Sequence, residues 1–203
     1  MHASESSVAV ATLVETCSAR YKSVMSKPRM SRETLLPAMA AHVLAHGLAS
    51  VSLRPLAKAA GTSDRMLIYH FGNRQGVIDA LLEYLAALFE AGLEAAFPTQ
   101  TATTRQDTLR QVLAATSTPD LAPFMRVWWE LVAASAAGDA TYRKSAAAIM
   151  GTLLDWLERH MPENDPDPKG GARLVLTMIE GSQMLGAVGR ADIAEAALLA
   201  FEG

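Results

Sequence analysis

The sequence predicts an all-α protein, and three observations lead to this fold class. Apolar residues recur at intervals of three and four along most of the chain, which is the period of an amphipathic helix. Aromatic residues make up only 6% of the 203 residues, and no alternating strand-like run with glycine turns appears. The hydrophobic fraction of 50% is ample for a buried core in one large or two small domains.

Residues 1–30 form an N-terminal extension whose middle has the apolar spacing of an amphipathic helix. Its end gathers four basic residues, Arg20, Lys22, Lys27 and Arg29. Three interpretations stay open. The extension is an arm that reaches DNA, as in homeodomain arms, or a helix that packs on the body, or a segment outside the natural product, since Met25 and Met30 are available as starts.

The next expected helix runs from Ser31 to His46 and is stopped by Gly47. Its predicted apolar stripe consists of Leu36, Met39, Ala40, Val43 and Leu44. Pro37 allows two alternatives: the first turn is kinked, or the regular helix starts near Leu36. His42 and His46 have the spacing of metal ligands, but no third ligand lies at a matching local spacing, so we expect no metal site.

Two short helices with a tight turn between them are expected from Ser52 to Phe71, as in a helix-turn-helix. Ser52 is the expected cap of the first helix, and its hydroxyl should bond to the Arg54 N–H because Pro55, at the third position, has none. Gly61 should end this helix in a left-handed conformation. Thr62 and Ser63 supply the next cap.

The second short helix, from Asp64 to Phe71, has two different faces. At 3.6 residues per turn, Leu67, Ile68 and Phe71 share the inner arc. The opposite arc carries Arg65, Met66, Tyr69 and His70. A guanidinium, a phenol and an imidazole on one exposed face fit a DNA major groove. Asp64 has two possible roles: it stabilises the positive end of the helix dipole, or it accepts a hydrogen bond from a cytosine amine.

The run Gly61-Thr62-Ser63, then Leu67, then Tyr69-His70-Phe71-Gly72 followed by Arg74 resembles the DNA-binding domain of the TetR family of bacterial transcriptional regulators. The resemblance covers roughly Ser31 to Leu88. It departs at Ile68, where family members often have an aromatic residue, and at Arg74-Gln75, where many have Lys-Glu. It implies that the helix from Ser63 reads the groove, with phosphate contacts from nearby residues. The expected DNA-binding residues are Ser52, Arg54, Thr62, Ser63, Arg65, Met66, Tyr69, His70 and Arg74.

Charge is distributed unevenly along the chain. Residues 20–76 hold nine Lys or Arg against two acids, a balance of +7, so the net charge of −3 leaves −10 for the remainder. A basic segment on an acidic body is the pattern expected of a domain that neutralises DNA phosphates.

The remaining helices are expected at about 74–97, 105–116, 120–137, 140–160, 172–188 and 192–201. Asp120 should cap the third of them with Pro123 at its third position, and 163–171 should be a loop. We therefore predict an extension at 1–30, a three-helix DNA-binding domain at 31–76 and a helical effector-binding and dimerisation domain at 77–203. The apolar terminal helices favour pairing with a second copy as a four-helix bundle, which the resemblance also implies.

The Met- and aromatic-rich body is similar to the effector-binding domain of the family, and a cavity lined by such groups suits a largely apolar ligand. The candidate residues are Phe124, Trp128, Trp129, Met150, Trp156, Met178 and Met184. Helical spacing alone would also produce them as a plain core. Glu180 is the one acid in an otherwise apolar helix; it bonds a ligand, joins a buried network or faces solvent.

The sequence contains no nucleophile elbow, phosphate-binding glycine loop or metalloprotease motif, so we expect neither an enzyme nor a cofactor. The single cysteine, Cys17, and the missing pattern of a signal peptide or a membrane span favour a cytoplasmic protein. The prediction is a homodimeric repressor that leaves a palindromic operator in double-stranded DNA when it binds an unidentified small effector. The alternative is a helical dimer that binds a small molecule or a protein without binding DNA.

Overall fold

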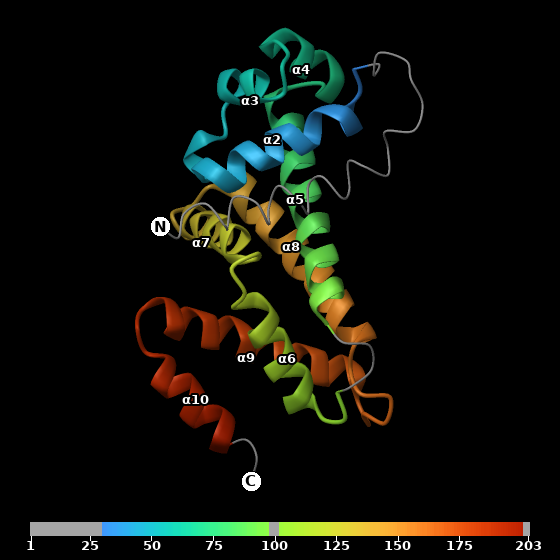
Figure 1. The fold of residues 1–203 in the computed structure, drawn as a ribbon, viewed down its shortest axis with the longest axis vertical. Coiled ribbons are helices and arrows are strands. Elements are labelled where there is room, and N and C mark those ends of the chain that lie inside the picture. The colour runs from blue at the N-terminus through green and yellow to red at the C-terminus, as the bar shows by residue number, and fades with distance from the viewer. Residues whose placement is uncertain (1–29, 98–101, 201–203) are drawn as a thin grey trace. The chain divides into compact units, whose positions relative to one another are not determined.

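The computed structural model describes residues 30–97 and 102–200, which contain nine α-helices, one 3₁₀ helix and no strand (Figure 1). The predicted all-α fold class is therefore confirmed. The N-terminal extension before Met30, part of the expected linker and Phe201 lie outside the described residues. The chain divides into two compact units, of which one contains 30–89 and Pro119–Ala146 and the other contains Glu90–Thr118 and 147–200. The functional boundary expected between residues 76 and 77 stays a prediction.

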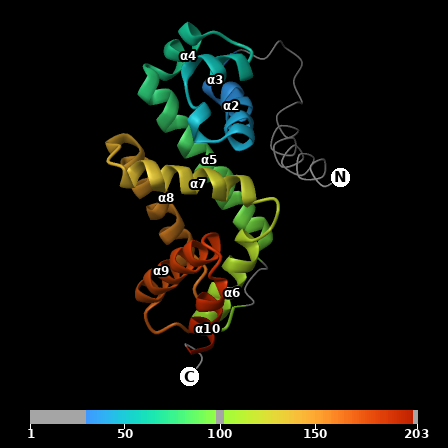
Figure 2. The ribbon, with the colours of Figure 1, turned by 90° about the vertical axis from the view of Figure 1, so that its left-hand side faces the viewer.

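The first unit begins with the helices around the predicted helix-turn-helix, which Figure 2 shows gathered beside one another. They are α2 (Arg32–His46), the 3₁₀ helix η1 (Leu48–Ser50), α3 (Leu53–Ala59), α4 (Asp64–Phe71) and the first part of α5 (Arg74–Ala96). α2 packs against α3, and α3 packs against α4. The core of this group is fully buried at Met39, Val43, Leu56, Leu67 and Val77.

Helix α2 begins at Arg32 and carries Pro37 inside it, so a start near Leu36 is wrong. Its first turn is closed by Thr34, whose Oγ1 accepts a hydrogen bond from the Ser31 N–H at 3.0 Å. Pro37 forgoes only the bond to the Glu33 carbonyl, which lies in the exposed first turn where water can replace it. The buried stripe contains Leu35 instead of the expected Leu36.

The first unit also contains α7 (Ala122–Ala136) and the start of α8 (Ala140–Arg159). The expected cap at Asp120 is wrong: the residue before α7 is Leu121, and Pro123 occupies the second helical position. Leu121 is only 2% exposed, and its burial fixes where the helix begins. Gly138 closes α7 as predicted, with φ of 99°.

The second unit is built on α9 (Pro168–Ala187), which packs against α6 (Arg105–Thr116) and α10 (Ala191–Ala200) (Figure 1). The loop expected at 163–171 ends earlier than predicted, because α9 begins at Pro168. Asp167 caps this helix by accepting a hydrogen bond from the Gly170 N–H at 3.0 Å. The core of this unit includes Leu109, Val112, Trp156, Leu157, Val175 and Ile179. None of the helices formed by 30–97 and 102–200 is long and apolar enough to cross a membrane.

Candidate nucleic-acid interface

The turn between α3 and α4 is closed by Gly61, as the sequence predicts. Its φ is 64°, which is the left-handed region that favours glycine. Two backbone bonds complete the turn: the Gly61 N–H donates to Lys58 O at 3.2 Å, and the Thr62 N–H donates to Ala57 O at 2.9 Å. This pair of bonds is a Schellman motif, and it fixes the direction in which α4 leaves α3.

The start of α3 differs from the prediction at Ser52. Ser52 is the N-cap residue in an extended conformation and Pro55 is at the third helical position, but the Ser52 hydroxyl makes no cap bond, so the expected bond to Arg54 is wrong. The Ser52 N–H is held by Ser50 O at 2.8 Å, and the residue itself is exposed, where water satisfies the hydroxyl equally well. Ser52 and Arg54 both face solvent.

The start of α4 follows the prediction. The Ser63 Oγ accepts a hydrogen bond from the Met66 N–H at 3.3 Å, and Asp64 occupies the first helical position. Thr62 takes a different role from capping, because its Oγ1 contacts the Met30 Sδ at 3.2 Å. The side chain of Asp64 is exposed, so both of its possible roles stay open.

The inner face of α4 is anchored by Leu67 and Phe71, which are 0% and 5% exposed, while Ile68 is half-buried. Arg32 holds the end of this helix. Its Nε donates to the His70 carbonyl at 2.5 Å, and its guanidinium carbon lies 5.4 Å from the centre of the Phe71 ring. No local pattern links Arg32 to α4, because 38 residues separate it from His70.

The outer face of α4 presents its side chains to different extents. Tyr69 is 77% exposed, Arg65 is exposed, and Met66 is half-buried. His70 is half-buried, with its ring edge-on to Tyr69 at a centroid distance of 5.1 Å. The His70 Nε2 is buried and has no hydrogen-bond partner among the described residues. The phenol and the guanidinium are therefore the groups that this face offers most openly.

Exposed basic side chains occur on α3, on α4 and at the start of α5. Arg54, Lys58, Arg65 and Arg74 are all exposed, and Asp64 is the one acid on the surface of α3 and α4. Carboxylates on these helices therefore repel DNA phosphates only weakly, and the exposed cations can neutralise such phosphates. The structure thus brings the predicted basic residues of α3, α4 and the start of α5 into one compact unit.

The seven candidate effector residues are divided between the units. Phe124, Trp128 and Trp129 lie on α7 in the first unit, whereas Met150 and Trp156 on α8 and Met178 and Met184 on α9 lie in the second. Their burial varies widely, since Met184 is 52% exposed and Trp156 is 1% exposed.

Trp156 contacts Glu94, His160 and Phe97 within the second unit. Its Nε1 donates to Glu94 Oε2 at 2.8 Å, and this bond is the main cause that lowers the pKa of Glu94 from its usual range. Its ring stacks on His160 at 4.0 Å and meets Phe97 edge-on at 5.0 Å. Trp156 is therefore a core residue first, as the alternative interpretation of these residues allows.

The two histidines of α2 stack on each other, with ring centroids 4.3 Å apart. Burial, with a smaller contribution from His46, lowers the pKa of His42. No group of three or more metal-ligating side chains that could hold an ion occurs in the described parts of the chain.

Known proteins match this chain in a family model and in fold. Residues 38–81 match the family model described as "Bacterial regulatory proteins, tetR family". No sequence among the curated proteins matches the chain. The fold matches a protein described as a TetR-family transcriptional regulator from Rhodococcus sp., with 22% identity, a TM-score of 0.61, and coverage of 83% of this chain and 94% of that one.

Two further solved structures have the same fold. A protein described as a transcriptional regulator from Streptomyces coelicolor A3(2) has 24% identity and a TM-score of 0.58, with 81% of this chain and 94% of that chain covered. The multidrug binding protein EbrR, complexed with imidazole, has 20% identity and a TM-score of 0.58, with 83% and 87% covered. The fold is the one that helix-turn-helix transcriptional regulators have. The chain carries the N-terminal domain of the tetR family and has the fold of TetR-type transcriptional regulators.

Proposed function

We propose that the chain is a homodimeric repressor that leaves a nearly palindromic operator when a small, largely apolar effector binds. The observation that carries the DNA-binding part is the division of α4 into a buried face at Leu67 and Phe71 and an open face with Arg65 and Tyr69. Such a helix is held firmly by its own core and still presents donors to base edges.

Phosphate contacts are proposed for Ser52, Arg54, Tyr69, His70 and Arg74. Arg54 and Arg74 are exposed cations at the start of α3 and of α5, on either side of α4 in sequence. Arg65, Met66, Thr62 and Ser63 are proposed to lie at the groove itself. His70 is half-buried and its Nε2 is covered, so this nitrogen is poorly placed to reach a phosphate.

Dimerisation is supported by the surface of α9 and α10. Five large apolar residues remain exposed on these helices and the turn between them, namely Leu174, Met184, Val188, Ile193 and Leu199. Apolar side chains gathered on paired terminal helices are typical of a four-helix interface with a second copy. A dimer would present two α4 helices about 34–36 Å apart, which is one turn of DNA.

Effector binding is proposed within residues 77–203. The candidate residues that supply apolar and aromatic surface are Phe124, Trp128 and Trp129 of the first unit and Met150, Trp156, Met178 and Met184 of the second. EbrR, with which this chain shares its fold, is a multidrug binding protein. An effector changes DNA affinity only if it binds one conformation of the dimer better than the other.

The test is a mobility-shift titration of operator fragments selected from the source genome. Arg74→Ala should weaken binding to every sequence and reduce the salt slope by about one unit, because one phosphate contact is lost. Arg65→Ala should also relax base preference at one position. Lys169→Ala, an exposed cation at the start of α9, is the charge-matched control. If both variants bound DNA as the wild type does, α4 would not be the reading helix.

A further inference from the structure

Two charged side chains of α7, Arg126 and Glu130, hold the end of α2 and the turn that follows it. The Arg126 Nη2 donates a hydrogen bond to the Leu44 carbonyl, and the Glu130 Oε2 accepts one from the Leu48 N–H. Because four residues separate them, Arg126 and Glu130 lie on the same face of α7. Both bonds are charge-assisted and therefore among the stronger ones in this unit.

Leu44 and Leu48 are also four residues apart. In an uninterrupted α-helix, the Leu48 N–H would donate to the Leu44 carbonyl. Gly47, with φ of 82° and ψ of 175°, breaks the helix between them and separates these two backbone groups. α7 then supplies the missing partner to each: a guanidinium for the carbonyl and a carboxylate for the N–H. The same donor and acceptor can be satisfied by α7 while the chain is bent, or by each other in a longer helix.

The bend is fitted closely to Glu130. A Cβ at Gly47 would lie 2.7 Å from Oε1 and 2.9 Å from Oε2 of this carboxylate, which is closer than such contacts occur. On the other side of the bend, the Gly47 carbonyl accepts from the Ser50 N–H at 3.2 Å and the Ser50 Oγ at 2.6 Å. The chain then continues through Ser52 into α3. The conformation at Gly47 therefore sets how α3 and α4 are oriented on α2.

We infer that Arg126 and Glu130 are positioning residues that keep the Gly47 turn bent and so hold α3 and α4 in their DNA-binding orientation. On this inference the backbone groups of Leu44 and Leu48 have two alternative sets of partners, and α7 supplies the partners of the bent turn. Trp128 and Trp129 lie on α7 between the two residues, so a ligand that moved α7 would act directly on both bonds. The consequence for DNA rests on the proposed function; the bend itself does not.

The first experiment needs no DNA. NMR backbone shifts of the full chain are compared between the wild type and the double variant Arg126→Ala/Glu130→Ala. The Gly47 and Leu48 Cα shifts should move toward helical values in the double variant. The shift of the Leu48 amide proton should also change, because this proton loses its carboxylate partner. Unchanged shifts at Gly47 and Leu48 would overturn the inference. Arg143→Ala/Glu195→Ala, which removes one exposed cation and one exposed acid elsewhere, is the control and should leave these shifts in place.

The second experiment measures operator affinity at several salt concentrations. The double variant should bind the operator roughly tenfold more weakly. Its salt slope should be unchanged, because the variant loses the orientation of α3 and α4 but no phosphate contact. Glu130→Gln keeps an acceptor oxygen for Leu48 and should restore binding to within about threefold of wild type in a chain that retains Arg126. Wild-type affinity in a double variant whose Gly47 shifts have moved would overturn the positioning role. A wild type that binds no DNA would instead refute the proposed function, while the shifts still decide the bend.

If the double variant fails to fold, the single variants Arg126→Gln and Glu130→Gln test the inference instead. Glu130→Gln keeps the size of the side chain, Arg126→Gln shortens it, and each removes one charge. Arg126→Gln should move the Gly47 shift part of the way toward helical values and Glu130→Gln by a smaller amount, because the amide still accepts from Leu48; both should melt close to the wild type. Both single variants showing wild-type shifts would overturn the inference.

Discussion

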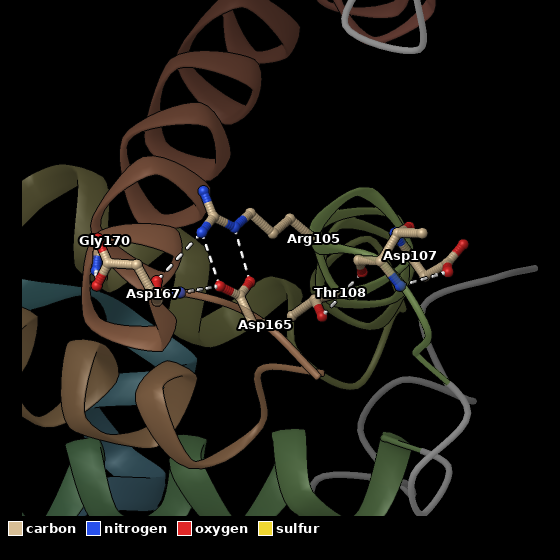
Figure 3. Close-up of polar contacts among 7 residues, drawn as sticks. Arg105, Asp107, Thr108, Asp165, Asp167 and Gly170 are labelled. Carbon is tan, nitrogen blue, oxygen red and sulfur yellow. Dashed lines mark hydrogen bonds and ion pairs between the residues drawn. The ribbon is translucent and has the colours of Figure 1, made fainter. Parts of the chain in front are cut away.

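Asp165 accepts two hydrogen bonds of 2.7 Å from Arg105, one from Nε and one from Nη2 (Figure 3). Arg105 is the first residue of α6, and Asp165 lies 60 residues later in the loop before α9. The Asp165 side chain is only 2% exposed, and its Oδ1 also accepts from the Asp167 N–H at 2.8 Å. One carboxylate therefore fixes both the start of α6 and the cap of α9, the two helices that pack together in the second unit.

Asp165→Asn should destabilise the second unit. The amide can accept at one position only, so one of the two Arg105 bonds is lost and an NH₂ group faces the guanidinium. We expect a loss of roughly 1.5–3 kcal/mol in the free energy of unfolding, the usual range for hydrogen bonds to charged groups. Urea denaturation followed by circular dichroism measures it. Asp155→Asn, at an exposed position on α8, should change stability by less than about 0.5 kcal/mol. Equal stabilities of the two variants would contradict the role of the pair.

The same pair predicts a pH dependence. The bonds from Arg105 hold the pKa of Asp165 below its ordinary value of 3.8. Since the folded state favours the charged carboxylate, the stabilisation is present above the unfolded pKa and is lost as the pH falls through the lower, folded pKa. The stability difference between the wild type and Asp165→Asn should be constant above about pH 5 and shrink below about pH 4. A difference that grew toward acid would show the opposite sign and reject the assignment.

Gly61→Ala should weaken the helix-turn-helix through backbone strain alone. A Cβ at Gly61 meets nothing within 4 Å, but its φ of 64° is costly for alanine, by about 1–2 kcal/mol. Gly151→Ala is the matched control, because this glycine lies inside α8 with open space around its Cβ and no positive φ. The control should gain about 0.5–1 kcal/mol. Thermal unfolding of both variants tests the contrast, and a stabilised Gly61→Ala would rule out the left-handed turn.

Leu199→Glu should separate the proposed dimer. Leu199 is 65% exposed on α10, so the charge is tolerated in one folded chain but would be buried without a partner in an apolar interface. Light scattering after size-exclusion chromatography should show the monomer mass, about half that of the wild type. Ala114→Glu, on an exposed position of α6, should leave the mass of the wild type. A Leu199→Glu protein that kept the larger mass would place the interface elsewhere.

Much of the DNA-binding region was predictable because it is built from contacts between near neighbours. Gly61 ends α3, Ser63 caps α4, and Leu67 and Phe71 are buried on its inner face, all as their spacing and residue types indicate. The expectations that failed concern the ends of helices: the caps of α3 and α7, the buried face of the first turn of α2, where Leu35 takes the place of Leu36, and the start of α9. The cap bond expected from Ser52 is absent because this residue is exposed, and water can satisfy its hydroxyl. The cap expected from Asp120 is absent because α7 begins after the buried Leu121.

The sequence by itself determined most of the helices, the turn at Gly61 and the basic character of the segment that contains α3 and α4, because periodicity, turn chemistry and charge are local properties of a chain. Only the tertiary structure decided which distant groups complete those elements. Arg32 holds the end of α4, Arg105 meets Asp165, and Arg126 with Glu130 takes up the backbone groups that Gly47 separates. These partners lie 38 to 82 residues apart, and no local pattern records a contact that forms only when the chain has packed.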